Sequence, residues 1–336
     1  MANISSFSLP QMTDTVMRTF EDYAKTLPQV MKTSGFVKTR ALPKHVGDSK
    51  IFAEMVDSSK YAGIRDEGED ATEGVIQYGY EKTATVYGIA QTRSITKRMR
   101  DTGKDEEVMR HITFLGSVCP DTIDLNLANQ LTFAWSTSFS YDGHTLSTTV
   151  GDGLALISAS HTLTGSATTY SNQITSNPAF SKGALETAER SFVEESYDNL
   201  GVKTYCTPDT IITTDDPNTI NEVRQLMNAT ADVDTSNSGT YNVDKNRYKH
   251  VIVPRLATTA AGAPDTTKRK YWFLADSKMS DFYYYELNAP YIKAPADGNN
   301  GESFASENWS YLAAADYLIA IVSGKWIRGS KGDASA

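Results

Sequence analysis

The chain has 336 residues, of which 40% are hydrophobic and 22% are charged, and its formal net charge at pH 7 is −9. This composition is typical of a folded globular protein with one elaborated domain or a few smaller ones, and it excludes a largely disordered chain. The acidic balance also argues against tight nucleic-acid binding over the whole surface, because neutralising phosphates requires a net basic face.

Cysteine usage and hydropathy point to a reducing environment away from membranes. Cys119 and Cys206 lie far apart and belong to no CxxC motif, which speaks against a zinc site and a disulfide framework. No secretory signal is visible at the start of the chain. The longest apolar run, 311–322, is interrupted by Asp316 and is too short to span a bilayer. We expect no membrane partner, and a protein that is cytoplasmic or released by a route other than secretion.

The first hundred residues predict two segments without a core of their own. Residues 1–50 combine a weak helical period with an irregular stretch and indicate an arm. Residues 51–100 carry β-branched and aromatic residues around an acidic, glycine-rich stretch at 65–74, which predicts a long β-hairpin. Because a two-stranded hairpin is only marginally stable alone in water, it needs a supporting surface.

Residues 104–138 predict a long amphipathic helix. Apolar residues recur at three- and four-residue steps, and the first turn is acidic, as the helix dipole favours. Pro120 falls inside this helix, and its ring would clash with the carbonyl group of Gly116. We therefore expect a kink or a break there.

The rest of the chain predicts alternating loops, helices and strands. Residues 139–180 indicate a polar loop with short strands. One helix then follows Ser181 as its N-cap and stops at Gly201, and a second has Asp216 as N-cap and Pro217 at its first position. Four strand-like stretches complete the chain, at 249–256, 269–276, 281–292 and 311–330.

The segment 152–166 raises the question of catalysis, because it brings Ser158, Ser160 and His161 together. A nucleophile and its base need opposed side chains within hydrogen-bond reach, and these residues are sequence neighbours. The chain also contains no G-x-S-x-G motif. We therefore predict no catalytic residue here.

Two further motifs fail on inspection. The stretch 232–243 begins like a calcium loop, but Asn237 takes the glycine position and Val243 takes the position of the bidentate glutamate. Near the end of the chain, a phosphate-loop spacing places Ser330 before Lys331, the reverse of the required order. No metal and no cofactor are expected.

Two clusters of opposite charge stand out. The acidic tip of the hairpin comprises Asp66, Glu67, Glu69, Asp70 and Glu73. The basic end comprises Arg93, Lys97, Arg98 and Arg100, and Lys104 follows them in the same basic stretch. The basic end is either a solvated strand-to-helix junction or a docking surface for the acidic tip of a neighbouring copy, since charge complementarity fixes register and partner choice.

The order of these parts resembles the major capsid protein of tailed bacteriophages, which has the Hong Kong 97-type fold. An arm, a charged hairpin and a long helix precede an α/β part, and the last strands end in "WIRG". The segment "DGLALISASH" after the long helix, the "NLG" before "TPDTIIT", and the later "VIVPRL" and "YWFLAD" occur in the order typical of that family.

This resemblance implies an α+β fold, the Hong Kong 97-like capsid fold, with defined parts. They are an N-terminal arm at 1–50, an E-loop hairpin at 51–100, a P domain at 101–200 with the spine helix 104–138, an A domain at 201–300, and C-terminal strands at 301–336 that return to the P domain.

The resemblance further implies a structural, non-enzymatic protein of the virion, in which His161 closes a strand in the loop after the spine helix. Such subunits assemble in the host cytoplasm as hexamers and pentamers into an icosahedral head, which encloses double-stranded DNA without sequence-specific binding. A portal, decoration proteins and a separate scaffold protein, or no scaffold at all, are the partners it allows. Some family members crosslink a lysine to an asparagine. Lys60 and Lys82 lie in the hairpin here, but no motif supports crosslinking and we expect none.

Three other functions compete with this interpretation. An encapsulin-type compartment of the same fold, which encloses a protein cargo, is poorly separated from a phage head by sequence, although the resemblance favours phage. A Ser/His hydrolase depends on the weak segment at 152–166. An extracellular β-rich adhesin is disfavoured by the missing signal.

Overall fold

The structure is a computed structural model that describes residues 17–22, 27, 29–44, 47–102, 104–232, 239–293 and 308–332. Its mixed content of helices and strands confirms the predicted α+β class. Several short elements connect the larger ones: α2 (Val30–Thr33), α3 (Lys97–Asp101), β5 (Ser138–Tyr141), β6 (His144–Ser147), β7 (His161–Leu163), β8 (Ser166–Tyr170), and the 3-10 helices η3 (Pro254–Ala257) and η4 (Thr266–Lys268).

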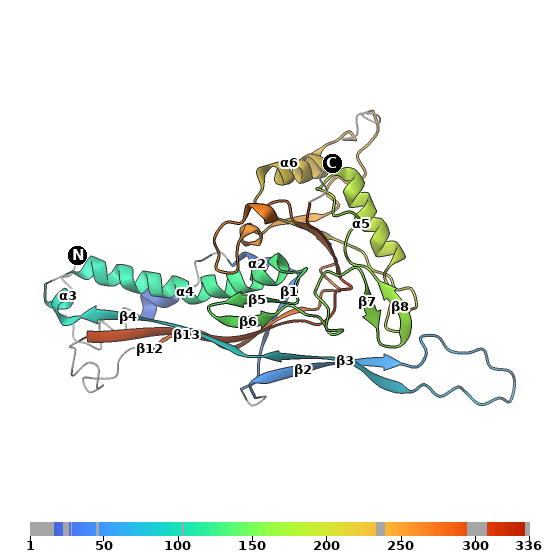
Figure 1. Ribbon diagram of the computed structural model, residues 1–336, viewed down its shortest axis with the longest axis horizontal. Helices are drawn as coiled ribbons and strands as arrows, with labels where there is room; N and C mark the ends of the chain where they lie inside the picture. Colours follow the sequence, from blue (N-terminus) through green and yellow to red (C-terminus); the bar gives the residue numbers. More distant parts are fainter. Residues whose placement is uncertain are drawn as a thin grey trace.

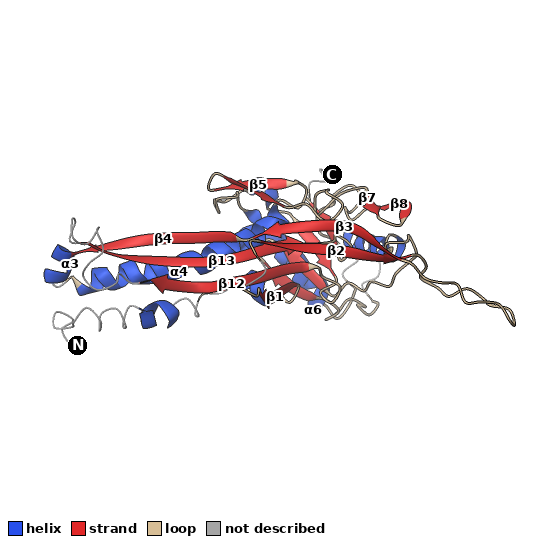
Figure 2. Ribbon diagram, turned by 90° about the horizontal axis from the view of Figure 1, so that it is seen from below, coloured by secondary structure: helices blue, strands red, loops and turns tan. Residues whose placement is uncertain are grey.

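A four-stranded sheet runs along the long axis of the molecule (Figure 1, Figure 2). Its strands, in spatial order, are β1 (Val37–Ala41), β12 (Phe282–Lys293), β13 (Asn308–Ile321) and β4 (Tyr87–Thr96). Strand β1 runs parallel to β12, and the other pairs are antiparallel. The arm therefore supplies an edge strand to a sheet built mainly from the end of the chain.

The long helix α4 (Asp105–Thr132) lies along one face of this sheet (Figure 1). Its buried apolar residues recur at three- and four-residue steps: Val108, Ile112, Leu115, Ile123, Leu127 and Leu131. They share a core cluster with Ala313 and Ala315 of β13. The small alanine side chains let the helix approach the sheet closely, so the predicted amphipathic face is confirmed.

Helix α4 does not break at Pro120, so this part of the prediction is wrong, whereas the kink stays a prediction. The helix has 28 residues, includes Pro120, and ends at Thr132 instead of at 138. An interior proline costs a helix about 3 kcal/mol, because it removes one hydrogen bond and crowds the preceding turn. Burial of α4 residues on both sides of Pro120, such as Leu115 and Ile123, offsets that cost and keeps the helix whole.

The hairpin consists of β2 (Ser49–Asp57) and β3 (Ile76–Thr85), which pair with each other in a separate two-stranded sheet. It extends from the body and ends in the long loop at the right of Figure 1. The predicted second strand is divided at Val86, whose N–H donates to the carbonyl of Asp48 at 2.8 Å. Beyond this point Tyr87 pairs with Tyr317 of β13, so β4 belongs to the long sheet and only β3 to the hairpin.

A second four-stranded sheet has the order β10-β9-β11-β14. Its strands are β10 (Lys249–Ile252), β9 (Thr210–Thr213), β11 (Trp272–Ala275) and β14 (Ile327–Ser330). The helices α5 (Lys182–Glu194) and α6 (Pro217–Asn228) accompany it at the top of Figure 1. The predicted strand at 311–330 is thus two strands, β13 and β14, which lie in different sheets.

Both predicted helix N-caps are confirmed. The hydroxyl of Ser181 accepts the N–H of Ala184, and the carboxylate of Asp216 accepts the N–H of Thr219. The predicted stop at Gly201 is wrong, because α5 already ends at Glu194. Gly201 instead occupies a later turn with φ of +77°, a conformation that glycine adopts without strain. Both cysteines of the sequence are free thiols.

Candidate functional site

The hairpin exposes one apolar face. The side chains alternate, so that Phe52 and Val56 turn toward the body while Ile51 and Met55 turn to solvent. Met55 pairs across the hairpin with Tyr78, whose side chain is 75% exposed. The exposed large hydrophobic residues of this region, which we call the outer face, are Ile51, Met55, Tyr61, Ile64, Val75, Ile76 and Tyr78.

An exposed apolar face on a thin projection needs an explanation. Soluble monomers rarely leave large contiguous apolar patches uncovered, and such patches commonly mark protein–protein contacts. A two-stranded sheet also has two open edges along which another chain can approach. The outer face is therefore a candidate interaction surface.

The acidic tip lies in the loop between β2 and β3, and its five carboxylate residues are all exposed. The N–H of Glu69 donates to the carbonyl of Asp66 at 3.2 Å and closes a turn there. The five carboxylates thus lie in one loop at the end of the hairpin and are exposed to solvent.

The basic end lies at the junction of β4 and α3. Arg93 in β4 and Lys97 and Arg98 in α3 are exposed. Arg100 belongs to the same helix, and its side chain lies outside the described part of the structure. In both views the basic end, marked by α3, and the hairpin loop lie at opposite ends of the long axis (Figure 1, Figure 2). The two clusters do not meet within one subunit.

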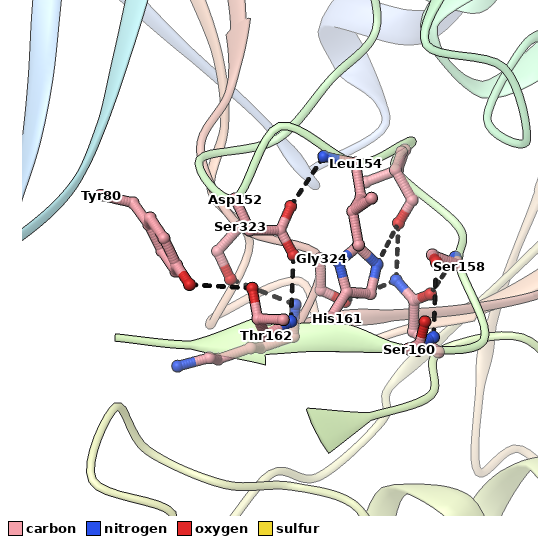
Figure 3. A network of polar contacts seen from close by, with 12 residues as sticks. Tyr80, Asp152, Leu154, Ser158, Ser160, His161, Thr162, Ser323 and Gly324 are labelled. Carbon is pink, nitrogen blue, oxygen red and sulfur yellow. Dashed lines mark hydrogen bonds and ion pairs between the residues drawn. The ribbon is translucent and has the colours of Figure 1, made fainter. Parts of the chain in front are cut away.

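The segment with Ser158, Ser160 and His161 is a structural junction (Figure 3). The His161 ring is fully buried and stacks on Tyr170 with their centroids 5.0 Å apart. Its Nδ1 lies 2.8 Å from Oδ2 of Asp152, and its Nε2 lies 3.3 Å from the carbonyl oxygen of Leu156.

Neither serine hydroxyl is a partner of the His161 ring. The N–H of Ser160 donates to the Ser158 hydroxyl, and the N–H of Ser158 donates to Oδ1 of Asn172. A nucleophile–base pair requires a direct hydrogen bond between the two groups. The three residues therefore do not form the arrangement of a serine hydrolase.

Asp152 holds this junction together. Its carboxylate accepts the N–H groups of Leu154 and Thr162 as well as facing the ring of His161. Burial alone would raise the pKa of Asp152, but the contacts with His161 and the two N–H groups more than offset it and lower that pKa. The carboxylate thus stays charged and ties the loop to the start of β7. The expectation that His161 closes a strand is wrong, because His161 is the first residue of β7.

Of the two other sequence motifs, the stretch 232–243 lies partly outside the described residues, and the second is part of a strand. Asp232 forms an ion pair with Lys182 at 2.7 Å, while Asn237 lies outside the described residues. Ser330 is buried in β14 and donates to the carbonyl of Pro178 at 2.6 Å, so this part is a strand and not a phosphate loop. Within the described ranges, no group of three or more His, Cys, Asp or Glu residues could hold a metal ion.

The helices of the described residues include none that is both long and apolar enough to cross a membrane.

The two hairpin lysines contact their own subunit. The Lys60 ammonium lies 3.0 Å from the carboxylate of Asp198. The Lys82 ammonium donates to the carbonyl and hydroxyl oxygens of Thr149 at 2.7 and 2.8 Å. The sequence does not predict these contacts, or those that Glu54 and Tyr80 make with the body, because no local pattern identifies pairs so distant in the chain.

This chain is similar to known proteins in its structure but not detectably in its sequence. No family model and no curated protein matches the sequence. A solved structure from Gordonia phage Cozz is similar, with 10% identity, coverage of 90% of this chain and 89% of the other, and a TM-score of 0.50. This likeness shows the fold, and the Hong Kong 97-type fold implied by the resemblance is confirmed.

Two other similar structures are described as capsids. "Capsid structure of the Cyanophage P-SCSP1u" has 12% identity, coverage of 88% and 85%, and a TM-score of 0.49. "Capsid of native GTA particle computed with C5 symmetry" has 11% identity, coverage of 90% for both chains, and a TM-score of 0.47.

Proposed function

We propose that this chain is the major capsid subunit of a tailed bacteriophage and has a structural role without catalysis. Its copies would associate as hexamers and pentamers into an icosahedral head that encloses double-stranded DNA in the virion. The observation that carries the proposal is the hairpin, which projects from the body with its apolar outer face in solvent.

The outer face gives the physical reason for assembly. A subunit that buries this face against a neighbour removes large side chains such as Tyr78 and Ile76 from water. Apolar burial contributes about 25 cal/mol per Å², and obligate interfaces bury about 2,000–5,000 Å². A closed shell repeats each contact many times, so a modest free energy per contact is enough.

The parts of the fold fit the domain plan of such a subunit. In this assignment residues 1–50 are the N-terminal arm and residues 51–100 the E-loop. The P domain is 101–200, with α4 as its spine, the A domain is 201–300, and residues 301–336 return to the P domain. The presence of two separate sheets, one next to α4 and one beside α5 and α6, supports distinct P and A parts. The sheets do not follow the ranges throughout, because β4 and β12 lie in the long sheet and β14 lies in the second sheet.

The charges support a head-to-tail contact between neighbours. The acidic tip of one copy would dock on the basic end of the next, through Arg93, Lys97, Arg98 and Arg100. Because the two clusters lie at opposite ends of the subunit, the contact is heterologous, and such contacts close into rings when the rotation between subunits allows it. Charge complementarity would set the register of the ring.

The test is electron microscopy and sedimentation of the purified chain at increasing concentration. The proposal predicts rings, tubes or polyhedral shells with six-fold and five-fold capsomers. A chain that stays monomeric at every concentration would contradict it. Shells isolated from the native source that contain a protein cargo and no DNA would indicate an encapsulin-type compartment instead.

A further inference from the structure

The root of the hairpin is tightly fitted to the body of the subunit. A cavity of about 30 Å³ lies there. It is lined by Glu54 and Tyr80 of the hairpin, and by residues 150–152, 162–164, 170, 199 and 322–325 of the body. A space of this size admits one or two water molecules and no larger ligand. The region is therefore a contact between two parts of the chain and not a binding site.

The first contact depends on a glycine. The hydroxyl of Thr164 donates to Oε2 of Glu54 at 2.7 Å. A Cβ atom on Gly79 would lie 2.7 Å from this same oxygen and 2.9 Å from Oγ1 of Thr164. The missing side chain at position 79 lets the Glu54 carboxylate reach across β3 to the body, at the point where the strand register shifts between Ala53 and Met55.

The second contact joins the hairpin to the buried junction around His161. The hydroxyl groups of Tyr80 and Thr162 lie 2.8 Å apart (Figure 3). The N–H of Thr162 donates to Asp152, which also holds the ring of His161. The hairpin thus touches a part of the body whose position is fixed by a buried carboxylate.

Two lysines extend the same line of contacts. Lys82, nearest the body, donates to Thr149, and Lys60, nearest the tip, pairs with Asp198. Between them Val56 packs against Gly165, where a Cβ atom would lie 3.3 Å from the valine Cγ1. Because these contacts are spread along the hairpin from Lys82 to Lys60, they fix the direction of the hairpin relative to the body as well as its point of attachment.

These contacts are made by side chains. Among the described residues β2 and β3 pair only with each other, so no sheet hydrogen bonds hold the hairpin to the rest of the molecule. The direction of the hairpin can therefore be changed by substitution without dismantling either four-stranded sheet.

We propose that the contacts Glu54–Thr164, Tyr80–Thr162 and Lys82–Thr149 form a latch that holds the hairpin of the unassembled subunit in the direction needed to reach a neighbouring copy. This inference rests on the proposed function, because it assigns positioning residues to assembly. The latch limits the conformations that the hairpin must give up on association, and such preorganisation favours binding.

A release variant tests the latch in the full chain. Thr164→Val with Tyr80→Phe removes two hydroxyl groups and keeps the shapes of the side chains. The matched control, Thr145→Val with Tyr205→Phe, makes the same changes at exposed positions outside both the latch and the outer face. Because two hydrogen bonds are lost, we expect the release variant to assemble about thirtyfold more slowly, which corresponds to about 2 kcal/mol. The control should assemble as the parent does.

Hydrogen exchange of dilute subunits separates the latch from the proposed function. Release should speed exchange in segment 161–165 and in β2 and β3, with an unchanged melting temperature for the body. Faster exchange together with normal assembly would refute the role of the latch and leave the capsid proposal intact. Unchanged exchange would show that no latch exists, whether or not shells form.

A locked variant gives the opposite test. Gly79→Cys with Thr164→Cys places the new sulfur atoms within reach of each other, since the Cβ at 79 lies 2.9 Å from the present Oγ1 of Thr164. Oxidised subunits should assemble at the parental rate, and reduced subunits more slowly because the Glu54–Thr164 bond is lost. If oxidation blocks assembly and reduction restores it, the hairpin must leave this position and the proposal is overturned.

Discussion

The imidazole of His161 and the carboxylate of Asp152 form a buried pair, with Nδ1 and Oδ2 2.8 Å apart. The pair holds the loop that follows α4 and supports the hairpin through Thr162. Asp152→Asn should destabilise the fold by about 2–3 kcal/mol, because the variant leaves buried donors short of an acceptor. Chemical denaturation measures the loss.

The serines of the same segment provide the matched control. Ser158→Ala and Ser160→Ala should each change stability by less than about 1 kcal/mol and leave assembly unchanged, because neither hydroxyl contacts the ring. Esterase activity in the parent that disappears in either variant would contradict the structural role assigned to this segment.

Reversal of the basic end should stop assembly without unfolding the subunit. Arg93→Glu with Arg98→Glu repels the acidic tip of the next copy, and we expect capsomers to be lost at low salt while the melting temperature stays within a few degrees. Light scattering follows assembly. The control is Arg110→Glu on the exposed side of α4, which should assemble normally.

A compensating exchange makes this prediction specific. Adding Asp66→Lys and Glu69→Lys to the reversed basic end restores opposite charges and should restore assembly. If the variant with exchanged charges is folded and still does not assemble, the acidic tip and the basic end do not contact each other.

The outer face should matter for assembly and little for folding. Tyr78→Ser and Met55→Ser change exposed side chains, so their effect on the free energy of unfolding should stay within about 0.5 kcal/mol while assembly is weakened. Phe52→Ser is the contrasting variant, because the Phe52 ring stacks on Tyr283 with centroids 5.6 Å apart and should be needed for folding. Equal effects on assembly and stability for all three would contradict the assignment of faces.

Pro120 is a site where the subunit can be stabilised. Pro120→Ala supplies the missing N–H to the carbonyl of Gly116 within a helix that is already continuous. We expect a gain of about 1–2 kcal/mol, since the restored bond and relieved crowding outweigh the greater freedom of the unfolded chain. Urea denaturation checks it, and a loss of stability would show that α4 depends on the proline.

The pH dependence of the body should include His250. Burial, with a smaller effect of Arg224, lowers the pKa of His250 to about 4, and its Nε2 lies 2.8 Å from the hydroxyl of Thr213. A depressed histidine pKa means that the folded state needs the neutral ring. Its contribution to stability is complete above the unfolded pKa of about 6.5 and is lost as the pH falls toward 4. His250→Gln should flatten the stability profile over this range, measured by thermal melts between pH 4 and 7.

The features that the sequence predicted well are local ones. Ser181 and Asp216 cap their helices because an N-cap bond spans only three residues. The buried face of α4 follows from its three- and four-residue spacing. The overall fold was predicted from the order of the motifs along the chain, because no single motif specifies it.

The features that were missed depend on distant partners. The division at Val86 arises because Tyr87 pairs with Tyr317, and nothing in the local alternation of apolar residues marks that change of sheet. The latch contact between Glu54 and Thr164 joins residues 110 positions apart. Gly79 does not predict this contact, since a glycine inside a strand indicates that another group approaches closely but does not identify that group.

Hydroxyl-radical footprinting of Met55 and Tyr78, in dilute subunits and in assembled particles, tests most directly whether a neighbouring copy covers the outer face. We predict that both side chains are oxidised rapidly in the dilute subunit and at least about tenfold more slowly after assembly, because water loses access to a buried interface. Equal oxidation rates in the two states would contradict this account.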